Sequence, residues 1–278
     1  MKLPQGFVGA ACAAGLKSTG ALDLTLIENK GPSFFGTAVF TSNKVVAAPV
    51  IWSKQVVKDQ IVRAVVLNSG GANACTGPQG FADTHATAEL VGDLLEVSSG
   101  EVVVCSTGLI GELLPMTKIE NGIKSIALEL KSESLQECAQ AIMTTDSVPK
   151  IAQAKLGKVQ VAGIAKGAGM LAPALATMLS VVMTDGQVSS NASKIFAQVT
   201  DRTYNRIDSD GCTSTNDTVL FMASGASGQT LSDSELEDLL MKVCGSLAAQ
   251  LIEDAEGSTK SVAITVNNAV SETDAVEV

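Results

Sequence analysis

Residues 166–185 constrain the chain more than any other segment. The first half is rich in glycine and contains a proline, which favours an irregular loop, and the second half is an apolar run typical of a buried strand. Ala176 and Thr177 lie where the loop gives way to the strand. Cleavage of the peptide bond before a threonine would free an α-amine that titrates near pH ~8 and can act as the base for its hydroxyl. The segment therefore suits a self-cleaving threonine enzyme, and a glycine turn before an ordinary buried strand is the alternative.

The rest of the chain alternates short β-rich runs with segments of helical length. Strands are expected at residues 23–28, 37–41, 64–68, 101–105, 159–165, 176–184, 217–224 and 261–266. Helices are expected at residues 81–96, 119–129, 135–143, 190–205 and 232–256, the last with Ser232 as a capping residue. Strong signals of both kinds predict an α/β or α+β fold. Residues 150–158 are the one short polar connector that indicates a boundary.

Composition bounds the size of the core and the kind of partner. Of the 278 residues, 46% are hydrophobic and 17% are charged, enough for one large α/β unit or about two domains. The formal net charge is −10 and no Lys or Arg cluster occurs, which argues against nucleic acid. The longest apolar runs fall short of the ~18 to 20 residues that span a bilayer, and the N-terminal residues lack the apolar core of a signal peptide. We expect a cytoplasmic protein with no membrane partner.

Histidine and cysteine chemistry is limited. His85 is the single histidine and no G-x-S-x-G sequence occurs for it to serve, so a serine or cysteine nucleophile with a histidine base is not expected. Histidine-based zinc sites are not expected either, and we predict no metal. The cysteines lack a C-x-x-C pair, which favours reduced, partly buried thiols over a disulfide framework. They are Cys12, Cys75, Cys105, Cys138, Cys212 and Cys244.

Two polar loops that contain glycine follow predicted strands. Residues 67–77 read LNSGGANACTG, and residues 105–111 read CSTGLIG. Glycines in such loops let backbone N–H groups point at an oxygen ligand, although ordinary turns have the same composition. In the second loop, the Thr107 hydroxyl beside the Gly108 N–H would form an oxyanion hole, which stabilises the charge of a tetrahedral intermediate by about 3 kcal/mol per donor.

Six short motifs then occur in a recognisable order. They are NSGGANACTG, STGLIGELLP, AIMTTD, AKGAGMLAPALATML, STNDTVLFMASG and DAEGSTK. Together they closely resemble the ornithine acetyltransferase family of arginine biosynthesis, whose members are often also N-acetylglutamate synthases. The resemblance runs from about Gly6 to the C-terminus.

The resemblance implies a two-domain α/β fold, with layers of helices around mixed sheets and the nucleophile on a central strand. It implies self-cleavage between Ala176 and Thr177 into an α chain of residues 1–176 and a β chain of residues 177–278, with Thr177 as the nucleophile. It also implies that Thr107 and Gly108 form the oxyanion hole. The residues implied to bind the amino-acid substrate are Thr144, Lys166, Thr177 and Glu256.

The implied reaction moves the acetyl group of N2-acetyl-L-ornithine to L-glutamate through an acetyl-threonine. No cofactor is implied, and acetyl-CoA is a second donor in the bifunctional members. The implied assembly has two α and two β chains. An aminopeptidase or amidase that uses the same threonine and passes the acyl group to water is the alternative within enzymes.

The C-terminal part departs from the family pattern. Family members carry a D-P-N-W-G-R segment and further substrate-binding residues, including an Asn and a Ser or Thr, and nothing in this sequence matches them. Trp52, the single tryptophan, lies in a different context. The expectation is a truncated reading frame, and an uncleaved, inactive binding or scaffold protein is the alternative from another class.

Overall fold

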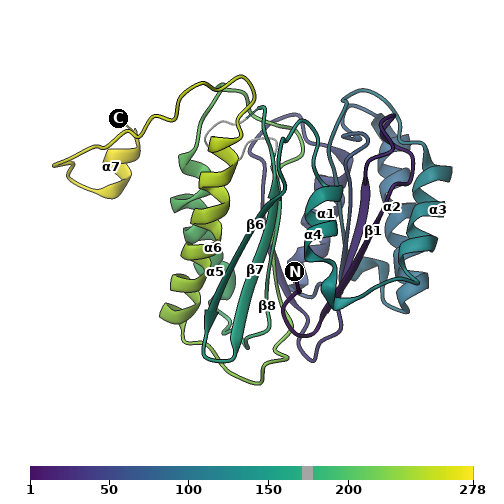
Figure 1. Cartoon of the computed structure of the whole chain (residues 1–278), viewed down its shortest axis with the longest axis horizontal. Coiled ribbons are helices and arrows are strands. Elements are labelled where there is room, and N and C mark those ends of the chain that lie inside the picture. The colour runs from purple at the N-terminus through teal and green to yellow at the C-terminus, as the bar shows by residue number, and fades with distance from the viewer. Residues whose placement is uncertain (171–177, 278) are drawn as a thin grey trace.

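The computed structural model describes residues 1–170 and 178–277. Two β-sheets lie face to face, and helices cover the outer side of each sheet (Figure 1). The first sheet has the order β1 (Phe7–Cys12), β2 (Leu24–Asn29), β4 (Ala64–Asn68), β5 (Val102–Ser106). The second has the order β3 (Phe35–Phe40), β9 (Thr218–Ala223), β8 (Leu179–Thr184), β7 (Val159–Lys166), β6 (Lys150–Leu156). One neighbouring pair in each sheet is parallel, β4 with β5 and β8 with β9.

Alternating side chains fill the space between the sheets. Val65 and Leu67 of β4 join Val181 of β8 in one buried cluster. Val66, between the two β4 residues, belongs instead to the cluster beneath the outer helices of the first sheet. Because successive side chains of a strand point to opposite faces, each sheet is buried on both sides. This explains why the central strands are nearly continuous apolar runs rather than alternating ones.

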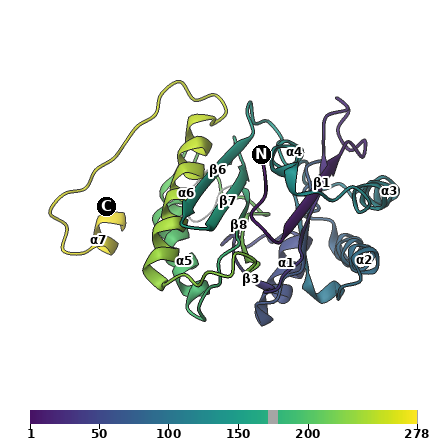
Figure 2. The ribbon, with the colours of Figure 1, turned by 60° about the horizontal axis from the view of Figure 1, so that its bottom comes forward.

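Helices cover the outer faces and close the edges of the sheet pair. The outer layers are α2 (Gly77–Leu95) with α3 (Met116–Ile126) on the first sheet and α5 (Ala192–Arg202) with α6 (Asp233–Glu253) on the second (Figure 2). Helix α1 (Ala48–Val56) packs against β5 and β3, and α4 (Leu135–Ala141) packs against β1, β2, β6 and β7. These two helices therefore lie at opposite edges of the space between the sheets. The short helix α7 (Glu272–Glu277) follows an exposed arm.

Most of the predicted elements are confirmed with small shifts at their ends. All five predicted helices are present, and α6 begins with the predicted cap, since Ser232 and Glu235 form a reciprocal capping box. The strand predicted at residues 176–184 starts at Leu179 within the described part of the chain. None of the described helices is long and apolar enough to cross a membrane. The prediction missed β1 and α1, which are short and lack a strong period.

The connector predicted at residues 150–158 is wrong. These residues hold β6, which pairs with β7 in a hairpin whose turn contains Gly157 at φ +58°. Strand β6 lies at the edge of its sheet and exposes much of its length. An edge strand needs fewer apolar side chains than a central one, so its polar sequence was misleading.

The strand predicted at residues 261–266 is also wrong. The alternation of Val262, Ile264 and Val266 suits a strand, but no described strand lies beside it to pair with. Val262 and Ile264 are 78% and 87% exposed. Period-two alternation alone does not make a strand, because the backbone groups need a partner.

The packing of α6 on β7 gives a stability prediction. Leu247 of α6 is fully buried and sits over Gly163 of β7, where an added Cβ would lie 2.8 Å from the Leu247 Cδ1 atom. Leu247→Ala should lower the free energy of unfolding by about 2 to 5 kcal/mol, because it leaves a cavity between helix and sheet. The matched control is Leu128→Ala, whose side chain is 87% exposed and should cost less than about 0.5 kcal/mol. Equal losses in urea denaturation would contradict this packing.

Candidate active site

A group of buried polar residues lies where the ends of strands from both sheets meet. Asn216, just before β9, donates its side-chain amide to the carbonyl of Ser106 at 2.8 Å and to that of Ala72 at 2.6 Å. Ser106 ends β5 of the other sheet, and its hydroxyl accepts a 2.6 Å hydrogen bond from the Asn68 amide at the end of β4. One buried amide thus joins the start of β9 to both polar loops of the first sheet.

The two loops that contain glycine pack on each other. Thr107 is buried, and its N–H donates to the Asn68 carbonyl at 3.0 Å. Gly108 has φ +131°, and a Cβ at this position would lie 2.8 Å from the backbone nitrogen of Gly71. Both the conformation and the close approach therefore require glycine. The structure places the predicted oxyanion pair in this tight turn.

Lys166 is a buried cation at the centre of the site. It ends β7, is only 1% exposed, and its Nζ donates to the Thr107 Oγ1 at 3.1 Å. Burial lowers the Lys166 pKa to about 8, against the charges of Asp146 and Asp217, which raise it, while the cations Lys150 and Lys17 add to the lowering. Thr107 and Lys166, which lie far apart in the sequence, are thus in direct contact.

Asp217 was not predicted as a site residue. It is fully buried, and its Oδ1 accepts the N–H of Met178 at 2.8 Å, while its Oδ2 has no hydrogen-bond partner among the residues that the structure describes. Burial raises the Asp217 pKa to about 7, although the Met178 N–H, the nearby Ser214 hydroxyl and the Lys166 charge all lower it. An acid directly before an apolar strand was the signal available in the sequence. Ala176 and Thr177 lie outside the described residues, but Met178 directly follows them.

Thr144 and Glu256 are connected to this centre by hydrogen bonds from their backbone N–H groups. The N–H of Thr144 donates to the Asp146 Oδ2 at 2.9 Å, and the N–H of Glu256 donates to the Ala168 carbonyl at 2.6 Å. The Glu256 carboxylate is exposed and lies over Gly169, where a Cβ would come within 3.3 Å of the Glu256 Oε2. The backbone of Glu256 is therefore tied to the segment that directly follows Lys166, and Thr144 is linked to it through Asp146.

Thr144 and Glu256 also border separate cavities. Thr144 lines one of about 480 Å³ together with Lys17, whose Nζ donates to the Leu22 carbonyl at 2.8 Å. Burial lowers the Lys17 pKa, opposed by the charges of Asp23 and Asp146. Glu256 lines one of about 360 Å³ at the end of α6. Lys17 is a second cation near the site that the sequence did not reveal.

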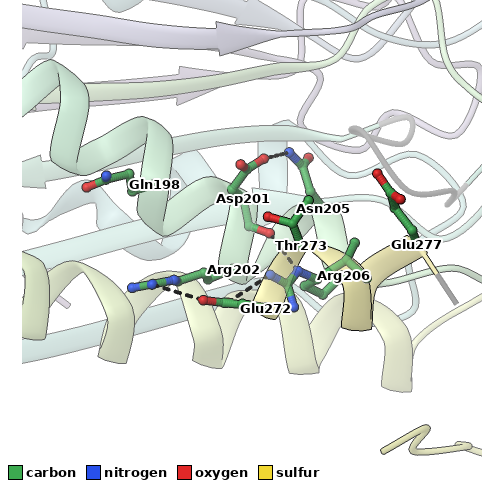
Figure 3. Close-up of a pocket in the computed structure, with 9 residues that line it drawn as sticks. Gln198, Asp201, Arg202, Asn205, Arg206, Glu272, Thr273 and Glu277 are labelled. Atoms are coloured by element: carbon green, nitrogen blue, oxygen red, sulfur yellow. Dashed lines mark hydrogen bonds and ion pairs between the residues drawn. The ribbon is translucent and has the colours of Figure 1, made fainter. Parts of the chain in front are cut away.

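A further cavity lies between α5 and α7 and holds none of the predicted site residues. Its volume is about 500 Å³, and Glu272 of α7 bonds Arg202 at 3.1 Å and Arg206 at 3.0 Å across it (Figure 3). These hydrogen bonds, first from Arg202 and then from Arg206, lower the Glu272 pKa. Surface ion pairs of this kind add little stability. The cavity is the space between α7 and the end of α5, and we assign it no functional role.

The single histidine lies on an outer helix, whereas one buried cysteine, Cys105, directly precedes Ser106 of this centre. His85 is half-exposed on α2, with its ring 5.0 Å from that of Trp52. All six cysteines are free thiols, as predicted, and three are buried. Within residues 1–170 and 178–277, no group of three or more His, Cys, Asp or Glu side chains is placed to hold a metal.

Comparison with known proteins decides the family. The ArgJ family profile matches residues 9–278. The arginine biosynthesis bifunctional protein ArgJ of Streptomyces avermitilis is 52% identical over 275 residues, which are 99% of this chain and 72% of that protein. The chain belongs to the ArgJ family. It is therefore an acyltransferase of arginine biosynthesis, and the resemblance of the six motifs is confirmed.

Solved structures of ArgJ proteins share the fold. The ornithine acetyltransferase of Mycobacterium tuberculosis, complexed with ornithine, has a TM-score of 0.57 at 51% identity, over 62% of this chain and 94% of that one. ArgJ of Bacillus halodurans has a TM-score of 0.55 at 32% identity, over 64% of this chain and 97% of that one. A Burkholderia β-aminopeptidase, only 11% identical, has a TM-score of 0.56 over 91% of this chain and 84% of that one, a likeness of fold alone. The predicted α/β class with helices around mixed sheets is confirmed.

The raised pKa of Asp217 gives a prediction about pH. Because the folded protein holds this proton up to about pH 7, whereas an unfolded aspartate releases it near 3.8, folding binds a proton between these values. Stability from this group is complete below pH ~4 and is lost as the pH rises to ~7, by at most about 4 kcal/mol. The side chain in Asp217→Asn does not titrate, so this variant should not show that loss of stability. Denaturation at a series of pH values from ~4 to ~7 measures the free energy of unfolding of both proteins. Asp93→Asn on the exposed side of α2 is the control, and a fall that persists in Asp217→Asn would contradict the assignment.

Proposed function

We propose that this chain transfers the acetyl group of N2-acetyl-L-ornithine to L-glutamate through an acetyl ester on Thr177. The observation that carries the proposal is the 3.1 Å contact between the Lys166 Nζ and the Thr107 Oγ1 beside the start of β8. This contact brings the Lys166 cation, the Thr107 hydroxyl and the turn at Gly108 close to the start of β8. Met178, the residue after Thr177, directly precedes that strand. The ornithine complex of the 51% identical acetyltransferase supports the substrate class.

The proposed reaction has two half-reactions. The Thr177 hydroxyl gives its proton to the α-amine of the same residue and attacks the acetyl carbonyl carbon, and the oxyanion is stabilised by Thr107 and Gly108. The tetrahedral intermediate collapses, the C–N bond breaks, and the nitrogen of ornithine takes the proton as it leaves. The amine of glutamate then attacks the acetyl ester and regenerates the hydroxyl. Lys166 and Glu256 provide a fixed cation and anion to orient an amino acid, which carries both charges.

Chain lengths among the relatives support self-cleavage before Thr177. The matched part of this chain is 62% of 278 residues, about 172 residues, in one ArgJ structure, and 64%, about 178 residues, in the other. Each match covers nearly the whole of the solved chain, 94% and 97%. Both values lie close to the 176 residues that precede Thr177, as expected if the solved chains are the α chains of cleaved enzymes.

The remaining properties are part of the proposal. The substrates are small molecules, no cofactor takes part, and acetyl-CoA is the donor to test for a second activity. After cleavage, the α chain of residues 1–176 and the β chain of residues 177–278 would assemble as a heterotetramer with two copies of each, in the cytoplasm. The fold likeness to the β-aminopeptidase makes hydrolysis the competing outcome. Supplying glutamate or water alone as acceptor distinguishes transfer from hydrolysis.

Maturation gives the first test. The protein should split into pieces of 176 and 102 residues, which together make the 278 of the chain, and the smaller should begin Thr-Met-Leu. Thr177→Ala should stay intact, because it lacks the hydroxyl that attacks the peptide carbonyl, whereas Thr177→Ser should still cleave. Mass spectrometry of the new N-terminus checks this. Cleavage of Thr177→Ala at the same bond would exclude Thr177 as the nucleophile.

The oxyanion hole gives the second test. Thr107→Ala should lower kcat for acetyl transfer by about 10²-fold or more with a smaller effect on KM, because the hydroxyl acts mainly on charge that develops in the transition state. Thr107→Ser keeps the hydroxyl and is the matched control. An effect confined to KM would make Thr107 a substrate-binding residue instead.

A further inference from the structure

One buried carboxylate binds the backbone at Thr144 and directly after Lys166, two of the proposed substrate-binding residues. The Asp146 side chain is fully buried, and its Oδ1 accepts the N–H of Gly167 at 2.7 Å. Its Oδ2 accepts the N–H of Thr144 at 2.9 Å. Gly167 directly follows Lys166, so Asp146 holds the end of β7 against the loop that carries Thr144.

Lys150 anchors this carboxylate to the end of α6. Its Nζ, also fully buried, donates to the Asp146 Oδ1 and to the Asp254 Oδ2, both at 2.6 Å. Asp254 caps the C-terminus of α6, two residues before Glu256. The loop after α4, the start of β6 and the end of α6 therefore meet at one ammonium group. Breaking such a buried pair leaves an uncompensated charge, so the network is strongly coupled to folding.

Asp146 also acts on the charge of Lys166. Among the groups that face the Lys166 ammonium, Asp146 and then Asp217 favour its charged form, whereas Lys150 and Lys17 disfavour it. Burial alone would raise the Asp146 pKa, but the Lys166 charge and the hydrogen bond from Lys150 bring it below its usual range. Asp146 is therefore ionised at neutral pH. Asp254, which binds the same Lys150, is not among the main charges that act on Lys166, and of the two carboxylates only Asp146 also binds the N–H of Gly167.

We propose that Asp146 is a positioning residue for Lys166, holding its backbone and supplying the negative charge that offsets the burial of its ammonium group. The consequence for substrate binding rests on the proposed function, because a charged Lys166 is what would hold a substrate carboxylate. Asp254 also binds Lys150 at 2.6 Å, but its other partner is Ser147 rather than Gly167, so its variant controls for the loss of a Lys150 partner alone. The two carboxylates therefore form a matched pair for the test.

The experiment compares Asp146→Asn with Asp254→Asn. The titration of Lys166 is followed by NMR of protein labelled with ¹³C at the lysine ε-carbons, the signal being assigned by its loss in Lys166→Arg. In Asp146→Asn the midpoint should fall by about one pH unit or more from its wild-type position near 8, because an opposite charge has been removed. In Asp254→Asn it should stay in place. An unchanged midpoint in Asp146→Asn, or an equal shift in both variants, would overturn the inference.

The same variants separate this inference from the proposed function. The KM for glutamate should begin to rise at a lower pH in Asp146→Asn than in the wild type, with a several-fold difference near pH 8, and should follow the wild type in Asp254→Asn. A wild-type protein without acetyl transfer would overturn the proposed function, while the NMR midpoint would still decide the role of Asp146. If Asp146→Asn does not fold, Asp146→Ser removes the charge with a smaller side chain, and the same fall in its midpoint is expected.

Discussion

A buried ammonium group ties the two halves of the fold together. Lys166 ends β7 of the second sheet, yet its Nζ bonds the Thr107 hydroxyl, which follows β5 of the first sheet. Placing a charge between two apolar sheets is costly unless polar partners surround it, so the nearby polar groups must be held in place. Asp146 supplies the opposite charge, Asp217 adds to it once its pKa of about 7 is passed, and backbone N–H groups bind both carboxyl groups. Thr107, Asp146 and Asp217 are therefore held around Lys166 by hydrogen bonds to the backbone.

The sequence predicts the central elements of the fold well and its margins poorly. Strands such as β4 and β8 are buried on both faces, so each is a continuous apolar run, and such a run between polar loops predicts a buried strand. At the edges the environment decides: β6 is polar and still a strand because β7 pairs with it. Residues 261–266 have the right alternation and are not a strand, since no strand in the described part of the chain pairs with them. Pairing is a property of the whole chain, which local patterns do not record.

The candidate site divides in the same way. The turn at Thr107 and Gly108 was accessible to sequence reasoning, because a glycine loop after a strand has few structural solutions, and the φ of +131° at Gly108 agrees. Asp146, Lys150 and Asp217 were missed. Their significance depends on burial and on partners far along the chain, such as the bond from Lys150 to Asp254, and a lone acid or lysine in a sequence is typical of a surface residue.

The same burial moves two opposite groups toward neutrality. Lys166 on β7 and Asp217 before β9 flank the start of β8, and their pKa values of about 8 and about 7 lie close together, whereas in water they differ by more than six units. Each pKa unit corresponds to about 1.4 kcal/mol, so near pH 7 either group can gain or lose a proton at small free-energy cost. Acyl transfer from an amide requires a proton to leave a hydroxyl and reach a departing nitrogen. In the proposed reaction the α-amine of Thr177 carries that proton, so Lys166 and Asp217 would act by setting the charge around Met178, which near pH 7 changes with pH as it would not for solvated side chains of the same types.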